Sequence, residues 1–299
     1  MDSNLHGPIL VTGGTGQLAT SLAKLGGARV VVVGRPEFDF DRPETIAATV
    51  GKYRPAFVVN AAAWTAVDLA ESEVAGATRA NETGPAELAR VCAAHDIPLI
   101  HVSTDYVYAG DKEGAYVETD PISPQTVYGR TKAAGEQAVL AAHPKSLILR
   151  TAWVYSAHGK NFVRTMINAG AKNPQLKVVG DQSGNPTSSD DLAAAILAVI
   201  EKLQQGWQDA YAGIYHAAGS GATTWHGLAV ATLKEAEKAG RPMPEILAIR
   251  TEDWPTPATR PQNSCLDCTK LQNTFNVTLP NWHDSISQTV KAILGQVMP

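Results

Sequence analysis

Tyr128 and Lys132 have the spacing of a catalytic pair. Helix positions four apart lie on one face, about one turn from each other. A phenol has a pKa near ~10, and a cation held close to it lowers that value. The pair could then donate a proton to a carbonyl oxygen, with the Thr104 hydroxyl holding the same oxygen. The same spacing also arises where a tyrosine packs on the aliphatic stem of a lysine, so the interpretation depends on the rest of the chain.

A glycine-rich turn lies near the start of the chain. The apolar run 9–11 leads into Thr12-Gly13-Gly14-Thr15-Gly16, and a helical pattern follows through Ala19 and Leu22. Glycine allows positive φ and close approach to a ligand, while a helix start offers free N–H groups to a phosphate. A plain loop is the alternative, but the order strand, turn, helix predicts dinucleotide binding with Gly13 and Gly16 in the turn.

The second strand, at 29–33, ends in Gly34-Arg35-Pro36. Chains that bind NAD often carry Asp or Glu here, which accepts from the ribose 2′-hydroxyl. Arg35 instead suits a 2′-phosphate through paired N–H donors, although an arginine after a strand is often only solvated. We therefore expect NADPH as the cofactor, with NADH as an accepted alternative.

Further apolar runs predict a parallel sheet. Residues 56–60, 99–103 and 146–150 are nearly continuous apolar stretches, as in strands covered by helices on both faces. Ligands of such sheets bind beyond the carboxyl ends of the strands, where Ala62-Ala63, Thr104-Asp105 and Trp153 fall. Strands and helical patterns alternate up to about residue 155, which indicates an α/β, Rossmann-like, doubly wound fold.

The regular alternation of strand and helix patterns ends after residue 155. We expect a dinucleotide-binding domain over 1–155, with helix 189–204 returning to it. Residues 156–188 and 205–299 should form mainly a smaller C-terminal, substrate-binding α/β domain. The loop 180–189 is rich in Asp, Gln, Gly, Asn and Pro, a composition typical of binding loops on a rigid scaffold.

Composition excludes several classes of function. The net charge of −4 and the lack of a basic cluster argue against nucleic acid, and no apolar run approaches the ~20 residues of a membrane span. The segment 1–6 lacks a charged leader and an apolar signal core. The chain has three cysteines, an odd number that suits a reduced cytoplasmic protein. Cys265-x-x-Cys268 has no second pair or nearby His, which disfavours a redox or zinc site.

Motifs along most of the chain carry a family resemblance. They occupy 11–19, 39–41, 59–68, 102–108, 128–132, 150–155, 159–162, 181–187 and 260–264. With these stretches the chain resembles the extended short-chain dehydrogenase/reductases and, more closely, the dTDP-4-dehydrorhamnose reductase family. The stretches 60–68, 103–108 and 181–187 are the most specific.

The resemblance implies roles for residues that match the family pattern. Tyr128 would be the proton donor, Lys132 would hold the nicotinamide ribose, and Thr104 would complete the catalytic set. Together with Gly13 and Arg35, the implied cofactor contacts are Gly16, Gln17, Leu18, Asp39, Phe40, Ala62, Ala63, Thr65, Tyr128 and Lys132. The expected substrate contacts are Thr104, Asp105, Trp153, Asn263 and Ser264. Trp153 could instead be a core residue.

The resemblance also implies a reaction, the NADPH-dependent reduction of the C4 ketone of a dTDP-linked 4-keto-6-deoxyhexose. Three alternatives remain: a reductase forming another dTDP-6-deoxyhexose, an epimerase that retains NAD(H), and a non-catalytic binding subunit. Some family members bridge a dimer with magnesium bound by C-terminal glutamates, but residues 281–299 contain no Glu. We therefore expect no metal, and a monomer or homodimer in the cytoplasm.

Overall fold

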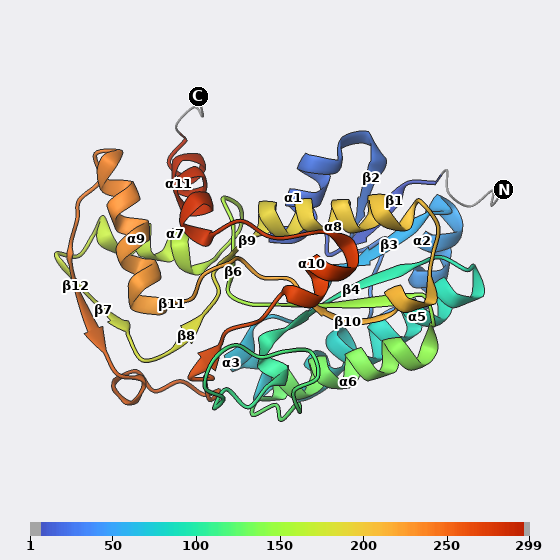
Figure 1. The fold of residues 1–299 in the computed structure, drawn as a ribbon, viewed down its shortest axis with the longest axis horizontal. Helices are drawn as coiled ribbons and strands as arrows, with labels where there is room; N and C mark the ends of the chain where they lie inside the picture. The colour runs from blue at the N-terminus through green and yellow to red at the C-terminus, as the bar shows by residue number, and fades with distance from the viewer. Residues whose placement is uncertain (1–6, 296–299) are drawn as a thin grey trace.

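Six parallel strands form the central sheet of the computed structural model, which describes residues 7–295 (Figure 1). Residues 1–6, on which the expectation of no leader rests, lie outside the described part. The strand order is β10-β5-β4-β3-β1-β2. The strands are β1 (Ile9–Thr12), β2 (Val30–Val33), β3 (Phe57–Asn60), β4 (Leu99–Thr104), β5 (Ser146–Thr151) and β10 (Gly213–His216). The prediction of a doubly wound parallel sheet is confirmed, and the order reverses at β1.

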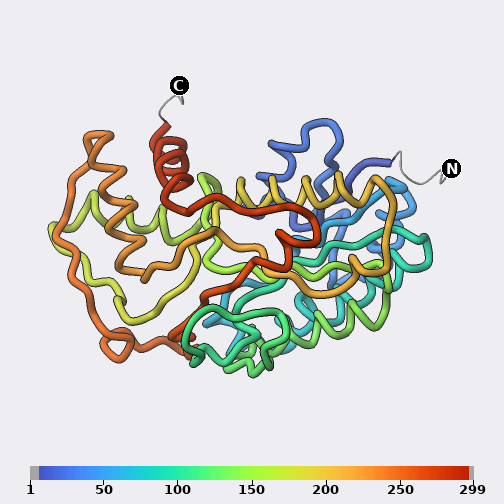
Figure 2. Tube along the Cα trace, viewed as in Figure 1, coloured from blue at the N-terminus to red at the C-terminus, as the bar shows by residue number. Residues whose placement is uncertain are grey.

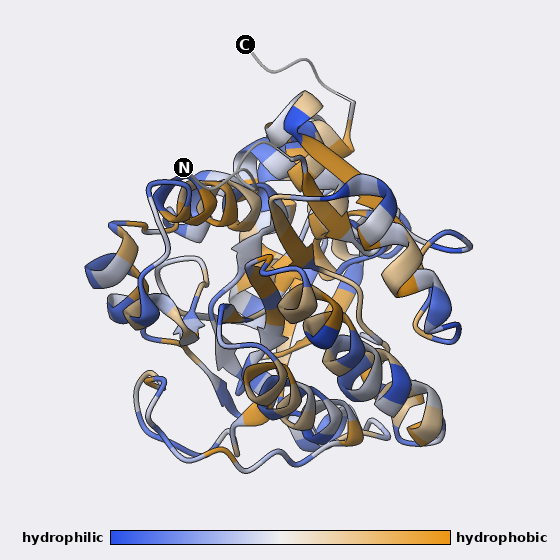
Figure 3. Ribbon diagram, turned by 90° about the vertical axis from the view of Figure 1, so that its right-hand side faces the viewer, coloured by the Kyte–Doolittle hydropathy of each residue, from blue (hydrophilic) through white to orange (hydrophobic). Residues whose placement is uncertain are grey.

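Helices cover both faces of this sheet (Figure 1). Apolar residues of α1 (Gln17–Gly26) and α8 (Ser189–Leu203) pack on one face, in a cluster that includes Leu22 and Ile196. On the other face, α2 (Glu44–Tyr53), α5 (Gly84–Ala94) and α6 (Val127–Ala142) supply the second cluster. Figure 3 shows the hydrophobic colour concentrated on the strands between these helices. This two-sided burial explains why the strands are apolar runs rather than alternating patterns.

A smaller part lies beside the sheet. Its core joins α7 (Phe162–Gly170), α9 (Trp225–Lys238) and α11 (Trp282–Ile293), with Trp282 fully buried among them. Short strands flank these helices in three groups. They are β7 (Gln175–Val179) with β12 (Glu245–Ile249); β11 (Thr223–Thr224), β8 (Ser183–Gly184) and β13 (Asn263–Ser264); and β6 (Val154–Tyr155) with β9 (Thr187–Ser188).

The remaining elements are short. Two α-helical turns, α3 (Val67–Ala70) and α4 (Val74–Thr78), lead into the π-helical turn η3 (Arg79–Thr83). The 3₁₀ turns are η2 (Gly27–Arg29), η4 (Asp105–Val107), η5 (Asp209–Tyr211) and η6 (Thr251–Asp253), and the last short helix is α10 (Thr269–Phe275). Within residues 7–295, no helix combines the length and apolar character needed to cross a membrane.

The C-terminal third of the chain alternates between the two parts. Residues 205–299 were expected mainly in the smaller part, but β10 pairs with β5 in the central sheet and Phe275 of α10 packs into the sheet's core. The physical reason is that β10 and α10 cover apolar surface on β5 and α8. Figure 2 shows the chain crossing from β13 to α10 and back to α11. Helix α8 packs against α1, and the domain limits themselves stay a prediction.

The contact between α6 and η3 depends on one glycine. A Cβ atom at Gly135 would lie 1.9 Å from the carbonyl oxygen of Asn81. The exposed helical Gly51, in contrast, has no atom within 4 Å of its Cβ position. We predict that Gly135→Ala destabilises the fold by about 1–3 kcal/mol through overpacking. Gly51→Ala should stabilise it by about 0.5–1 kcal/mol, because alanine favours helix. Urea unfolding of both variants checks this, and a Gly135→Ala protein as stable as the wild type would contradict the close contact.

Candidate active site

The predicted chemical residues gather at the carboxyl ends of β1, β3 and β4, where the N-terminal turn of α6 meets the sheet. Thr104 is the last residue of β4, and Asp105 opens η4 directly after it. Tyr128 lies in the first turn of α6, which begins after the N-cap residue Thr126. The Thr126 hydroxyl accepts a hydrogen bond from the Gly129 N–H at 3.0 Å, which fixes where the helix starts.

The glycine turn between β1 and α1 has the geometry of a phosphate-binding site. Gly13 has φ 111°, and its Cβ position would lie 3.1 Å from the Ala61 carbonyl group, so a side chain would strain this turn. Helix α1 begins after Gly16 with no side chain capping its free N–H groups. The Gln17 side-chain oxygen is buried without a partner in the described structure. Leu18 packs its side chain into the core, so only its backbone is free to face a ligand.

Ala62, Ala63 and Thr65 follow β3 on a loop beside this turn. The Ala62 N–H donates to Thr12 Oγ1 and to Asn60 Oδ1, both at 3.2 Å. Thr65 is exposed. The start of the loop is thus anchored by the polar ends of β1 and β3, and its contact with a cofactor stays a prediction.

Tyr128 is a buried phenol beside Thr104. Its ring packs edge-on against Tyr106, with ring centres 5.4 Å apart. Burial raises the pKa of Tyr128 above its ordinary value, while the Thr104 hydroxyl acts in the lowering direction. The structure therefore differs from the expectation that Lys132 lowers this pKa. Burial dominates, and the Lys132 amine is directed elsewhere.

The Lys132 side chain is buried and turned toward β4. Its Nζ donates to the Val102 carbonyl at 2.7 Å and lies 3.3 Å from His101 Nε2. Burial lowers the pKa of Lys132 to about 8, against the raising effect of the Glu136 charge. The amine is therefore held under the sheet edge, one helical turn from Tyr128.

A buried ion pair fixes the helix that carries Tyr128 and Lys132. The Glu136 carboxylate, one turn further along α6, accepts from Arg150 Nη2 of β5 at 2.6 Å. It also accepts from the Ser103 hydroxyl of β4 at 2.5 Å, and Arg150 Nη1 donates to Tyr108 at 2.7 Å. Both charged side chains are 2% exposed. Because a buried charge without its partner is costly, this pair holds α6 in one position on β4 and β5.

Asp105 is a buried carboxylic acid next to the same site. Its Oδ1 accepts from the Thr104 hydroxyl at 2.9 Å, while its Oδ2 has no regular hydrogen bond within the described residues. Burial raises the pKa of Asp105 to about 6, against the lowering effects of the nearby Ser264 and Thr104 hydroxyls. Ser264 Oγ is also buried without a regular partner. The Asp105 carboxyl and the Ser264 hydroxyl thus lie close together without a hydrogen bond of regular geometry, and a ligand hydroxyl could bond to them.

Arg35 and Asp39 lie together at the end of β2. Arg35 is 68% exposed and donates to Asp39 at 2.9 Å and to Asp41 at 2.7 Å. Phe40 packs against Gly84 and, edge-on, against Phe38. The predicted phosphate-binding guanidinium is therefore at the surface and already paired with carboxylates.

Two other predicted substrate residues have structural partners. Trp153 has φ 47° and stacks on Trp225 with ring centres 3.6 Å apart, while Gly184 packs against its indole. Asn263 donates from its side chain to the Lys112 and Gly114 carbonyls, at 2.8 and 2.6 Å. Asn263 also borders a hollow formed with loop 110–115. Both side chains are thus held by contacts within the protein, and Trp153 also packs on the cluster that contains Val107 and Ala133.

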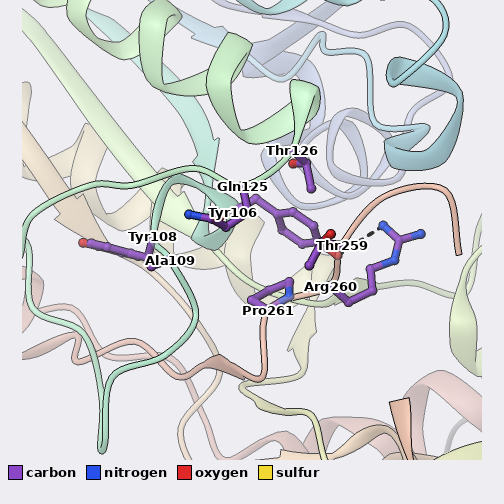
Figure 4. A pocket seen from close by; sticks show the side chains of 8 residues that line it. All are labelled: Tyr106, Tyr108, Ala109, Gln125, Thr126, Thr259, Arg260 and Pro261. Atoms are coloured by element: carbon purple, nitrogen blue, oxygen red, sulfur yellow. Dashed lines mark hydrogen bonds between the residues drawn. The ribbon is translucent and has the colours of Figure 1, made fainter. Parts of the chain in front are cut away.

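A small pocket lies next to the start of α6 (Figure 4). Its lining is Tyr106, Tyr108, Ala109, Gln125, Thr126, Thr259, Arg260 and Pro261. Arg260 donates to Asp68 at 2.6 Å and to the Tyr106 hydroxyl at 3.4 Å, so the C-terminal segment closes against α3 and η4 here. Sequence reasoning did not single out Tyr106 or Arg260 as site residues, although both fall inside the family motifs.

Sequence reasoning also missed His101. It is fully buried in β4, opposite Asn60 of β3 in the register of the sheet. The sequence pattern that could have identified His101 is a polar residue inside the otherwise apolar run 99–103. The neighbouring strand β3 also ends in a polar residue, Asn60. Among residues 7–295, no group of three or more His, Cys, Asp or Glu could hold a metal ion.

The acidity of Asp105 has a measurable consequence for stability. Its pKa of about 6 lies above the ordinary 3.8, so between these values the folded protein binds more protons than the unfolded chain. The contribution of protonated Asp105 to the free energy of unfolding is therefore fully present below pH 3.8 and is lost as pH rises through about 6. Asparagine cannot ionise, so we predict that Asp105→Asn is more stable than the wild type at pH 7.5 by about 2–3 kcal/mol. At pH 4.5 the difference in stability between variant and wild type should be smaller. Urea unfolding at both pH values checks this; an equal difference at the two would contradict the raised pKa.

Comparisons with known proteins agree along the whole chain. The family described as "RmlD substrate binding domain" matches residues 7–294. A dTDP-4-dehydrorhamnose reductase of Aggregatibacter actinomycetemcomitans is 41% identical over 284 residues, covering 93% of this chain and 96% of that protein. The crystal structure of a dTDP-4-dehydrorhamnose reductase from Clostridium acetobutylicum superposes with a TM-score of 0.88 at 34% identity, covering 96% of this chain and 99% of that one. The Bacillus anthracis dTDP-4-dehydrorhamnose reductase, solved in complex with NADP, gives a TM-score of 0.85 at 31% identity, covering 95% and 98%. The chain therefore belongs to the dTDP-4-dehydrorhamnose reductase family.

Proposed function

We propose that this protein reduces the C4 ketone of dTDP-4-dehydro-L-rhamnose with NADPH to give dTDP-L-rhamnose, the last step of dTDP-rhamnose biosynthesis. The observation that carries the proposal is the meeting of Tyr128, Thr104 and Asp105 at the carboxyl edge of the sheet, the same edge at which the glycine turn follows β1. Relatives that cover 93% and 96% of this chain are dTDP-4-dehydrorhamnose reductases by name. Since a fold alone does not determine function, this arrangement of side chains is the stronger support.

The residues around the glycine turn fit a dinucleotide. The uncapped start of α1 supplies N–H donors and a positive dipole end for a pyrophosphate. The positive φ of Gly13 brings the backbone close to a ligand without a side chain in the way. The unpartnered Gln17 oxygen could accept from a cofactor hydroxyl. When bound, the nicotinamide supplies hydride, and the protein orients and polarises the reacting groups.

Protein side chains manage the proton in this reaction. Tyr128 donates its phenolic proton to the oxygen of the C4 carbonyl, and Thr104 holds that oxygen through its hydroxyl. The raised pKa of Tyr128 keeps the phenol protonated and ready to donate at neutral pH. Lys132, whose amine contacts Val102 and His101 in the free protein, would stabilise the negative charge left on Tyr128 once its ammonium turns toward the bound ligand.

Asp105 and Ser264 are the proposed sugar contacts. Their unsatisfied oxygens lie beside Thr104, so they could bond to hydroxyl groups next to the reacting carbon. Trp153 would stack on a sugar or a base of the substrate, and Asn263 would contact sugar hydroxyls or the diphosphate. A monomer or homodimer working in the cytoplasm remains our expectation.

Removing the phenolic proton tests the central role. Tyr128→Phe keeps the ring and its packing on Tyr106 but cannot donate. We predict that kcat falls by about 10²–10⁴-fold, while dinucleotide affinity stays close to wild type. Steady-state kinetics with NADPH and dTDP-4-dehydro-L-rhamnose, together with NADP⁺ titration, measure both quantities. Near-normal turnover would remove Tyr128 from the mechanism, and NMR of the product distinguishes dTDP-L-rhamnose from another dTDP-6-deoxyhexose.

The cofactor preference can be tested at the end of β2. Arg35→Ala should lower kcat/KM for NADPH by about tenfold, since one exposed charge-assisted contact to a 2′-phosphate is lost, and leave the value for NADH unchanged. Arg29→Ala is a matched control, because Arg29 is a similarly exposed arginine at the other end of the same strand, near Glu201. An unchanged NADPH-to-NADH ratio in Arg35→Ala would refute the phosphate contact.

A further inference from the structure

A chain of buried polar side chains runs under the candidate site. It crosses three strands, from Thr12 of β1 through Asn60 of β3 and His101 of β4 to Lys132 of α6. The Thr12 hydroxyl donates to Asn60 Oδ1 at 2.6 Å. Asn60 Nδ2 lies 2.9 Å from His101 Nδ1, and His101 Nε2 lies 3.3 Å from Lys132 Nζ. All four side chains are at most 1% exposed, so they are shielded from bulk water.

The backbone fixes the direction of the Asn60 amide. The Ala62 N–H can only donate, and it reaches Asn60 Oδ1 at 3.2 Å. The oxygen of the amide therefore faces Thr12 and Ala62, and the NH₂ group faces His101. As a donor, this NH₂ group requires a lone pair on His101 Nδ1.

That requirement determines the tautomer of His101. Burial, and then the Lys132 charge, hold the pKa of His101 well below its ordinary range, so the ring is neutral. A neutral imidazole carries one N–H, and with Nδ1 accepting, the hydrogen must be on Nε2. The Nε2–H group then faces Lys132 Nζ. An ammonium has three donors and no lone pair, whereas an amine can accept from Nε2–H while donating to the Val102 carbonyl.

We propose that His101, held as its Nε2–H tautomer by Asn60 and Thr12, is a positioning residue that sets the protonation state of Lys132 and favours its uncharged amine in the free protein. The kinetic part of this inference rests on the proposed reductase function; the tautomer does not. Lys132 would regain its proton when it turns from His101 toward a bound ligand.

Other charges near Lys132 do not remove the conflict between the Nε2–H group of His101 and a charged Lys132, both of which can only donate. Glu136 on the same helix favours the charged form, but its carboxylate is engaged by Arg150 of β5 and Ser103 of β4. Tyr128 is neutral one turn away on α6, and Asp105 of η4 contacts Thr104 instead. His101 is therefore the side chain that meets the amine directly.

The tautomer can be measured without any activity. In the NMR spectrum of protein labelled with ¹⁵N-histidine, the ring signals of His101 are identified as those that disappear in His101→Gln. We expect the shifts of a neutral ring with hydrogen on Nε2 from pH 6 to pH 9. An Nδ1–H tautomer, or a ring that takes a proton in this range, would overturn the proposal. If His101→Gln does not fold, Asn60→Asp identifies the same signals by moving them to the Nδ1–H pattern.

The effect on Lys132 is read from the pH dependence of kcat/KM. Wild-type activity should decline above pH about 8, as Lys132 loses its proton. In Asn60→Asp the new carboxylate accepts from Nδ1–H, so Nε2 becomes an acceptor for the ammonium. In His101→Gln the side-chain carbonyl oxygen of the new glutamine can accept a hydrogen bond from the Lys132 ammonium. Both changes should move the decline upward by at least about one pH unit, whatever their effect on kcat.

A matched control separates this effect from a loss of buried packing. His143 is also a buried histidine, and its Nε2 contacts the Ile97 carbonyl away from Lys132. His143→Gln should leave the decline where it is. A decline that stays in place in Asn60→Asp and His101→Gln would overturn the proposal. If no variant and no wild-type preparation reduces the nucleotide sugar, the proposed function fails, and the tautomer alone decides the inference.

Discussion

The buried ion pair between Glu136 and Arg150 is the interaction on which the site depends. It joins α6 to β4 and β5 at a depth where water cannot replace either partner. Lys132 lies one turn before Glu136 on the same helix, and Tyr128 one turn before that. An α6 that slid or rotated would leave a charge unpaired, so the positions of both chemical residues relative to Thr104 follow from this pair. The close contact of Gly135 with Asn81 fixes the same helix from its other side.

Much of this arrangement could be predicted from the sequence. Apolar runs indicated β1, β3, β4 and β5, and parallel strands place their carboxyl ends at one edge, so Thr104, Asp105 and the glycine turn were expected together. Periodicity also indicated α8 as a returning core helix. These features depend on local patterns and on one general rule of sheet geometry, which is why they were accessible without coordinates.

Features that depend on tertiary contacts were not predicted. The sequence did not reveal that β10 extends the central sheet, since pairing between strands more than 60 residues apart leaves no local pattern. The charge effect expected on Tyr128 was outweighed by burial, which spacing does not reveal. Likewise, the role suggested for His101 depends on the register of β3 and β4 and on the direction of one amide group.

The repeated crossing of the chain between its two parts has a mechanical consequence. α8, β10 and α10 lie on the large sheet, while β7, α9, β12 and α11 lie outside it and occupy the intervals of sequence. No single cut in the polypeptide would release a self-sufficient half, because each half needs segments from both sides of the cut. Any movement of one part against the other must therefore bend several connecting segments of the chain at once.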